Sequence, residues 1–316
     1  MSNPQPVVSG YRHEALFYAG EAEFVSRMSA FIRDGARLGE PTLVVVSALK
    51  IERLRRKLGR AADKVQFADM ADVGSNPGRI ISAWREFVDL NASGGRPLRG
   101  VGEPIFPERS SAQLVECEGH EALLNAAFDD SVPFWLVCPY DTTALDPAVL
   151  STAERNHPVL AKGNRVLESL SYLGRQAEAV PFLGTLPEPP VEATAIPFGS
   201  GSLARVRSLV AQRAARSGFS AGAVADYVFS VNEVATNTLR HGGGGGMLRL
   251  WTEGDSLVSE VTDTGRFRPD PLVGRRRPPA DIHAGRGLWL VNQLCDLVQL
   301  RTFDAAVVVR LHMARR

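Results

Sequence analysis

The chain has 316 residues, which is long enough for two ordinary domains, and its 44% hydrophobic content is sufficient to build real cores. Lys and Arg (36) nearly balance Asp and Glu (35), so the net charge of +1 excludes a global basic field for nucleic acid. Residues 1–10 are polar and contain proline, and no long apolar run occurs, so we expect a cytoplasmic protein without a membrane partner. No Cys-x-x-Cys spacing occurs, and buried reduced thiols are expected at Cys117, Cys138 and Cys295.

The first half of the chain alternates strand-like and helix-like segments. The expected strands are short, apolar and β-prone, over residues 15–18, 43–47, 65–68, 98–101 and 134–138. Helices are expected between them, over residues 21–38, 48–59, 76–90 and 119–128. This alternation predicts a three-layer α/β domain, with a mostly parallel sheet covered by helices on both faces. Two further helices, over 146–160 and 162–173, are expected to complete it.

Ligands of a parallel sheet bind beyond the carboxyl ends of its strands. The polar candidates at those ends are Ser47, Asp69, Gly102-Glu103-Pro104 and Pro139-Tyr140-Asp141. No Gly-x4-Gly-Lys-Ser/Thr occurs, so the domain lacks a P-loop phosphate cradle and is not expected to be an enzyme. His13 is either a ligand-binding or switch histidine or, more commonly at the start of a strand, a hydrogen-bonded structural group.

Three short segments of this domain resemble the MEDS sensory domain: His13-Glu-Ala-Leu-Phe-Tyr18, Gly102-Glu-Pro104 and Cys138-Pro-Tyr-Asp141. The resemblance spans roughly residues 10–160 and implies a RecA-like sheet without the ATP site. It also implies that the domain senses a small, hydrocarbon-derived molecule, whose identity the sequence does not give. We therefore expect a sensory domain over 1–180, followed by a stiff Pro-rich linker over 181–201.

The last third of the chain, residues 202–316, predicts a second α/β domain. A first helix is expected over 202–218 and a second after Ser220, a suitable N-cap for the apolar-periodic segment that follows. The remaining elements are a hairpin over 247–252 and 257–262, a helix over 288–295, and strands over 297–302 and 306–312. The basic, Pro-containing loop 266–284 includes Arg275-Arg276-Arg277, which is interpreted as a solvated flexible lid.

Three motifs occur in a fixed order in this domain. Glu233 and Asn237 lie one turn apart on one helix face, Asp263-Thr-Gly265 directly follows a strand, and Gly285-Arg-Gly287 opens a helix. In that order, Glu-x3-Asn, Asp-x-Gly and Gly-x-Gly resemble the N, G1 and G2 boxes of the GHKL ATPases. The closest branch is the anti-sigma-factor serine kinases. The resemblance implies an α/β-sandwich (Bergerat) fold that binds ATP and Mg²⁺.

The chemistry of the G1 and G2 residues fits a nucleotide. Asp263 can accept a hydrogen bond from the exocyclic amino group of adenine, whereas guanine presents an acceptor there and is rejected. Gly265 lets the backbone approach the base where a Cβ would collide. A helix start with free N–H groups suits phosphate, and the candidates there are Gly285, Arg286, Gly287 and Leu288.

The N box supplies the expected metal ligand and base. Asn237 offers a carbonyl oxygen to Mg²⁺, a hard cation that takes phosphate oxygens and water as its other ligands. Glu233 is expected to be the general base that takes the proton from the attacking hydroxyl. His241 also lies on this face, but next to the glycine run 242–246 it is expected to cap the end of the helix.

The resemblance implies a regulatory serine/threonine protein kinase that depends on ATP. Its expected substrate is a STAS-type anti-sigma-factor antagonist, and it is expected to compete for a sigma factor under control of the sensory domain. One alternative is a non-catalytic switch that binds partners when ATP is bound. A sensor histidine kinase is disfavoured, because no helix pair bearing a phosphoacceptor histidine precedes the ATPase motifs. No direct contact with nucleic acid is expected, and a homodimer is compatible with the sequence.

Overall fold

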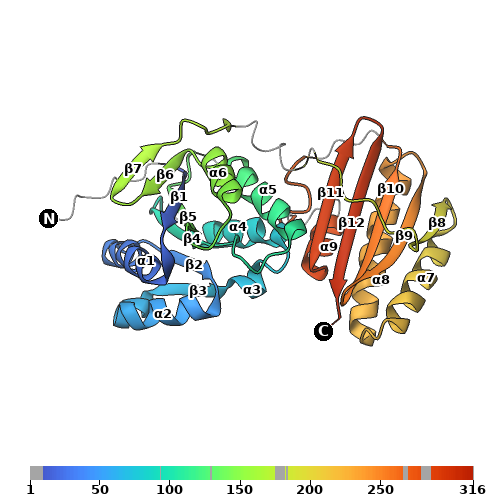
Figure 1. Ribbon diagram of the computed structural model, residues 1–316, viewed down its shortest axis with the longest axis horizontal. Coiled ribbons are helices and arrows are strands. Elements are labelled where there is room, and N and C mark those ends of the chain that lie inside the picture. The colour runs from blue at the N-terminus through green and yellow to red at the C-terminus, as the bar shows by residue number, and fades with distance from the viewer. Residues whose placement is uncertain are drawn as a thin grey trace. The chain divides into compact units, whose positions relative to one another are not determined.

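The computed structural model describes residues 10–92, 94–128, 130–174, 182, 184–265, 270–278 and 286–315. The chain divides into two compact units, Met1–Glu178 and Ala179–Arg316, each of which is an α/β structure (Figure 1). Across the described ranges, none of the helices combines the length and the apolar character that a bilayer span requires.

The N-terminal unit is built on a mostly parallel sheet, seven-stranded in the described residues, with the order β3-β2-β4-β5-β1-β6-β7. Its strands are β1 Arg12–Tyr18, β2 Thr42–Val46, β3 Val65–Asp69, β4 Leu98–Gly102, β5 Phe134–Asp141, β6 Val159–Lys162 and β7 Arg165–Glu168. Neighbours run parallel except at the edge, where β7 pairs antiparallel with β6. Every residue of β2 is buried, as expected of a strand covered on both faces.

Helices flank this sheet on its two faces (Figure 1). They are α1 Gly20–Leu38, α2 Ala48–Leu58, α3 Met70–Val73, α4 Ile80–Asn91, α5 Ser111–Ala127 and α6 Pro147–Asn156. Short polar side chains start several of them: Ser47 caps α2, and Ser110 forms a reciprocal capping box with Gln113 at α5. On one face, Phe24 of α1 and Leu54 of α2 are fully buried in a shared core with the strands. The predicted three-layer α/β architecture is confirmed.

The end of this unit differs from the sequence-based expectation. The helix expected over 162–173 is wrong, because β6 and β7 form a hairpin there, with Gly163 in its turn at a φ of 54°. The preceding helix, α6, ends at Asn156 rather than at residue 160. His157 precedes Pro158, and the proline ring disfavours helical geometry at the residue before it.

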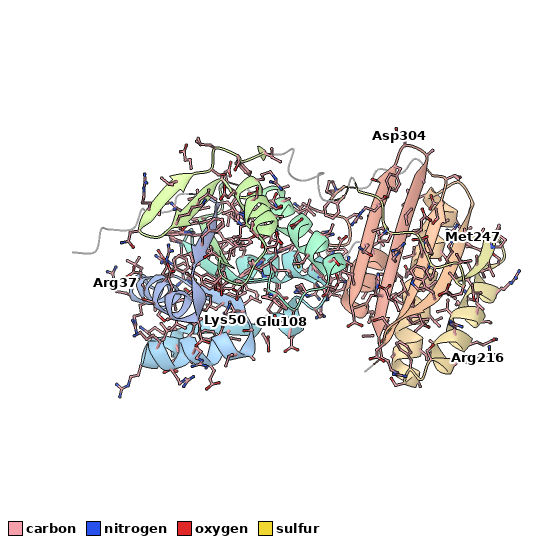
Figure 2. All side chains as sticks on the ribbon, viewed as in Figure 1. Arg37, Lys50, Glu108, Arg216, Met247 and Asp304 are labelled. Atoms are coloured by element: carbon pink, nitrogen blue, oxygen red, sulfur yellow. The ribbon has the colours of Figure 1, made fainter. Side chains whose placement is uncertain are left out.

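The C-terminal unit has an antiparallel sheet, five-stranded in its described part, with the order β11-β12-β10-β9-β8. Its strands are β8 Thr194–Gly199, β9 Gly245–Glu253, β10 Ser256–Asp263, β11 Leu297–Phe303 and β12 Ala306–Ala314. Figure 2 labels Met247 in β9 and Asp304 in the turn that joins β11 to β12. The helices α7 Leu203–Arg216, α8 Ala221–His241 and α9 Arg286–Leu294 bury their apolar sides in one core with the sheet.

The segment expected as a linker contributes to this sheet. Thr194–Gly199 pairs antiparallel with β9, and Ile196 and Phe198 are buried in the core. Pro197 is tolerated because β8 is an edge strand, where a missing N–H costs no ladder bond. The Pro-rich connection therefore ends before Thr194, not at residue 201.

Candidate nucleotide-binding site

Helix α8 positions the two N-box side chains. Ser220 caps its start by accepting a hydrogen bond from the Ala223 N–H (3.3 Å), and Val231 and Ala235 are fully buried in the core. Glu233 and Asn237 lie on the neighbouring, partly exposed side of the helix, one turn apart. The helix therefore holds a carboxylate and an amide side by side at the edge of the core.

Asp263 ends β10 and is only 7% exposed. Its Oδ2 accepts a hydrogen bond from the Thr238 hydroxyl (2.8 Å), and its Oδ1 accepts one from the Gly265 N–H (2.8 Å). Each carboxylate oxygen has two acceptor sites, so both bonds leave capacity for a further donor. These two bonds fix the carboxylate in one orientation, and this is what the recognition of a base edge requires.

Two glycines are packed tightly around this carboxylate. A Cβ on Gly242, the residue after α8, would collide with the Asp263 carboxylate, and a Cβ on Gly265 would lie 2.6 Å from the Gly242 Cα. Gly265 was expected to let the backbone approach a bound base. In the structure, its missing side chain lets it pack against the backbone of Gly242. The absence of these two side chains lets the backbone at both positions lie directly against the Asp263 carboxylate.

The G2 segment lies against the N box. Gly285 is outside the described residues, whereas Arg286, Gly287 and Leu288 form the first turn of α9, which starts two residues earlier than expected. A Cβ on Gly287 would collide with the Oε2 atom of Glu233, so the Glu233 carboxylate lies directly over this turn. The Glu233 carboxylate, the expected catalytic base, therefore lies beside the first turn of α9, the end of a helix that favours anions.

The described part of the basic loop, residues 270–278, is held by specific contacts. The Asn292 amide of α9 donates a hydrogen bond to the Gly274 carbonyl (3.0 Å). Arg275 is 7% exposed and its guanidinium lies 5.4 Å from the centre of the Phe182 ring, while Arg277 lies 5.7 Å from the Trp289 ring. Arg275 is therefore not the solvated lid residue that the sequence suggested, because aromatic stacking buries it.

Sequence reasoning missed Thr238 and Gly242. Thr238 follows Asn237 directly and lies one turn after the buried Val234, which places its hydroxyl on the core side of α8. Gly242 was treated only as part of the glycine run behind His241. His241 was expected to cap the helix, but it is the exposed last residue of α8, and the C-cap is Gly242. A hydroxyl residue on the core side of the helix, directly after the N-box Asn237, was the available signal for Thr238.

The polar residues at the strand ends of the N-terminal unit are mostly structural. Ser47 caps α2 and Asp69 accepts a hydrogen bond from the Ala71 N–H (2.9 Å) as the cap of α3. Asp141 accepts hydrogen bonds from the Gly20 N–H (3.2 Å) and the Thr143 N–H (2.9 Å). Tyr140 is buried, so it does not line an open ligand edge.

Glu103 is the exception, because it belongs to a buried polar group. It accepts hydrogen bonds from the Tyr18 hydroxyl and from the Lys50 ammonium, both at 2.6 Å. Burial raises the pKa of Glu103, and the Lys50 charge opposes that rise. Sequence reasoning identified Glu103 but missed Tyr18 and Lys50, which come from other elements (Lys50 is labelled in Figure 2).

The two units thus define a class of protein, an α/β unit on a parallel sheet joined to a second α/β unit with a candidate nucleotide site. The family model of the MEthanogen/methylotroph, DcmR Sensory domain (MEDS) matches residues 12–158. The family model of the histidine kinase-like ATPase domain matches residues 196–313. The chain therefore carries a MEDS domain fused to a histidine kinase-like ATPase domain. No curated protein matches the chain. This fusion indicates a regulatory ATP-binding protein.

Proposed function

We propose that the C-terminal unit transfers the terminal phosphoryl group of ATP to a serine or threonine of a STAS-type anti-sigma-factor antagonist. The observation that supports catalysis best is the close approach of Glu233 to Gly287, which brings a carboxylate beside the first turn of α9. A pure nucleotide-binding switch needs the phosphate-binding turn but has no need for a base beside it. The sensory unit then biases the kinase by binding its own ligand with different affinity in two states.

The residues present fit Mg-ATP. Asp263 is held with spare acceptor capacity for the adenine amino group, and Gly242 and Gly265 form a cradle that any Cβ would fill. Asn237 offers an amide oxygen to Mg²⁺, and the α9 turn of Arg286, Gly287 and Leu288 offers N–H groups to phosphate. Bound Mg²⁺ would offset the negative charge that develops on the phosphates during transfer.

In the proposed reaction, Glu233 accepts the proton of the attacking serine or threonine hydroxyl. The hydroxyl oxygen forms a bond to the terminal phosphorus, the bond to the bridging oxygen breaks, and ADP leaves. The phosphorylated antagonist then releases its partner, while the kinase unit competes for a sigma factor.

The test is transfer of label from radiolabelled ATP to a purified STAS-type antagonist encoded in the same genome. The proposal predicts label on a serine or threonine of the antagonist, and a rate of labelling lower by roughly 10²–10⁴-fold when Glu233 is replaced by alanine. Tight ATP binding without any transfer, across all such antagonists, would instead establish the non-catalytic switch.

A further inference from the structure

Four metal-binding side chains meet inside the N-terminal unit, away from the nucleotide site. His13 lies on β1, Cys138 on β5, Glu121 on α5, and His157 between α6 and β6. One ligand atom from each residue lies within 4.8 Å of the others, and no one of the four residues is more than 1% exposed. This group is called the His₂GluCys cluster below. Its members come from three elements and one connecting segment, so only the folded chain brings them together.

Three of the distances within the His₂GluCys cluster are close to those of a tetrahedral metal centre. Oε2 of Glu121 lies 3.2 Å from Nε2 of His13 and 3.1 Å from Nε2 of His157. Sγ of Cys138 lies 3.4 Å from Nε2 of His13. Bonds of about 2.0–2.3 Å from a zinc-sized ion to tetrahedral N, O and S ligands place those ligand atoms roughly 3.3–3.6 Å apart. The observed spacing is therefore close to that of a bound ion.

The hydrogen bonds of His13 define which nitrogen faces the cluster. Nδ1 of His13 lies 3.1 Å from the Asn125 side-chain oxygen. That amide cannot be flipped, because its nitrogen donates to the carbonyls of Ala122 (3.2 Å) and Asn156 (2.8 Å). Nδ1 must therefore be the donor, which leaves the lone pair of Nε2 directed at Glu121 and Cys138.

His157 is arranged in the same way. Its Nδ1 lies 2.8 Å from the carbonyl oxygen of Ala153, so it also carries a proton and donates it. Within the described ranges its Nε2 has no hydrogen-bond donor, and it lies 3.1 Å from Oε2 of the Glu121 carboxylate. A histidine that ligates a metal through one nitrogen typically donates its other N–H to a carbonyl or carboxylate. Both histidines of the cluster meet this condition.

A single proton leaves two of the four ligand atoms of the cluster facing each other without a donor, whereas a metal ion can contact all four. One proton on His157 pairs it with Glu121, and the Cys138 thiol can donate to His13, but the His13 and Glu121 acceptors still face each other at 3.2 Å. A divalent cation contacts all four atoms. Its charge is cancelled by one carboxylate and one thiolate, so the buried centre is neutral.

Two further buried oxygens near the cluster lack hydrogen-bond partners. They are Oε1 of Glu121 and the hydroxyl of Tyr140, whose ring packs edge-on against His157 with centroids 5.6 Å apart. Buried polar atoms without partners are rare, and an ion or a water is the usual explanation. The second carboxylate oxygen would be free to bind the same ion or a water molecule beside it.

We propose that the N-terminal unit binds a transition metal ion of the zinc class through Nε2 of His13, Nε2 of His157, the carboxylate of Glu121 and Sγ of Cys138. Imidazole and thiolate ligands select such metals over Mg²⁺ and Ca²⁺. The protein supplies all four positions, as in closed rather than catalytic zinc sites. The ion joins β1 and β5 at the middle of the sheet to α5 and to the segment before β6. Binding releases the thiol proton, so metal affinity rises with pH, and the bound ion stabilises the folded state of this unit.

The test uses the full-length chain. Metal content is measured by elemental analysis after purification, and the metal-stripped chain is then titrated with Co²⁺ and with Zn²⁺. We expect about one ion per chain, a tetrahedral Co²⁺ spectrum with a thiolate charge-transfer band, and a higher unfolding temperature with Zn²⁺. A folded wild-type chain that takes up neither ion would overturn the proposal.

Variants separate the ligands from their surroundings. Cys138→Ser should lose the charge-transfer band, whereas Cys117→Ser, at a buried thiol of α5 that contacts the Pro104 carbonyl, should keep it. Asn125→Ala should keep the band and weaken Co²⁺ affinity by roughly 10–100-fold, the range for losing the partner of a ligating histidine. Glu121→Gln removes a second ligand and should weaken Co²⁺ binding, but this variant can fail to fold. The Cys138→Ser result decides in that case, because a charge-transfer band that persists in it would show that Cys138 is not a ligand.

Discussion

Glu233 and Asn237 are neighbours on α8 and have different proposed roles, Glu233 as the general base and Asn237 as a ligand of Mg²⁺. Glu233→Ala should leave Mg-ATP affinity nearly intact, because Asp263 and the α9 turn still hold the nucleotide. Phosphoryl transfer should fall by roughly 10²–10⁴-fold, the range for losing a general acid–base group. Asn237→Ala should weaken Mg-ATP binding itself through loss of a metal ligand. Affinity and label transfer are measured on the same preparations.

The matched control is Asn232→Ala. Asn232 precedes Glu233 on α8, but its amide oxygen accepts a hydrogen bond from Arg207 (3.0 Å) at the exposed surface. This variant should bind ATP and transfer phosphate as the wild type does. Transfer at the wild-type rate by Glu233→Ala would show that Glu233 is not the base.

Lys50 allows a test of the buried carboxylate in the sensory unit. Lys50→Met leaves Glu103 buried beside Tyr18 without its cation, and should lower the free energy of unfolding at pH 7 by about 3 kcal/mol. Because burial raises the folded-state pKa of Glu103 above its usual value, the folded state holds the proton to higher pH than the unfolded state does. The lost stability should therefore return as pH falls towards 5.

Unfolding of the full chain at pH 5 and pH 7, resolved by hydrogen exchange over residues 12–162, measures this effect. Lys57→Met, at the C-terminal turn of the same helix, is the control and should change stability little at either pH. A Lys50→Met defect that is equal at both pH values would mean that the Glu103 charge is not its cause.

At the scale of elements, the junction between α8 and β9 shapes the candidate nucleotide site, because Gly242 at the C-cap of α8 packs against the Asp263 carboxylate. Gly242 has a φ of −102°, which any residue adopts, so Gly242→Ala should fold. Its new methyl group must displace the Asp263 carboxylate, and ATP affinity should fall by at least roughly tenfold, since the bond to the base edge is lost. Calorimetric titration of the folded variant measures the change.

Gly222→Ala is the matched control on the same helix. A Cβ at Gly222 meets no atom within 4 Å, so this variant should keep ATP affinity and gain up to about 1 kcal/mol of stability. Equal ATP affinities in the two variants would show that the close packing of Gly242 on the Asp263 carboxylate has no effect on ATP binding.

The sequence predicted those elements whose own residues determine them. Helix α8 was predictable because Ser220 caps it and its apolar residues recur at helical spacing, and β2 because it is continuously apolar. The β6–β7 hairpin was not, because the short segments around Gly163 have no clear period and depend on pairing with β1. The same limit applies to β8, which joins its sheet only through β9.

Sites were predictable to the extent that their residues are close in sequence. Glu233 and Asn237 share one helix, and Asp263 and Gly265 share one turn, so spacing alone grouped them. Glu233 and Gly287 lie on separate elements and were grouped only by the resemblance of their motifs, whereas the residues of the His₂GluCys cluster share no motif. Only the packing of the sheet and its helices brings such groups together.

At the scale of the whole molecule, the two units should be separable. Val191 and Glu192 are exposed, whereas Pro187 accepts a hydrogen bond from Arg310 (2.6 Å) and β8 begins at Thr194. A Glu-specific protease should therefore cut first after Glu192. The fragment 193–316 retains β8 and should still bind ATP.

Mass spectrometry of the early fragments and calorimetry of the C-terminal fragment measure this outcome. First cleavage inside either sheet would contradict the boundary. A folded fragment without ATP affinity would show that the nucleotide site needs residues before 193.

The central claim is that the buried Asp263 carboxylate reads adenine, and nucleotide titration of the full-length chain tests it most directly. Wild type should bind Mg-ATP and bind Mg-GTP at least roughly 10²-fold more weakly, because guanine faces the carboxylate with an acceptor. Asp263→Asn should lose ATP binding, since its amide presents a donor to the adenine amino group. Asp255→Asn, in the exposed turn at the other end of β10, should bind as wild type does. Wild-type ATP affinity in a folded Asp263→Asn chain, or equal affinity for GTP, would contradict the account.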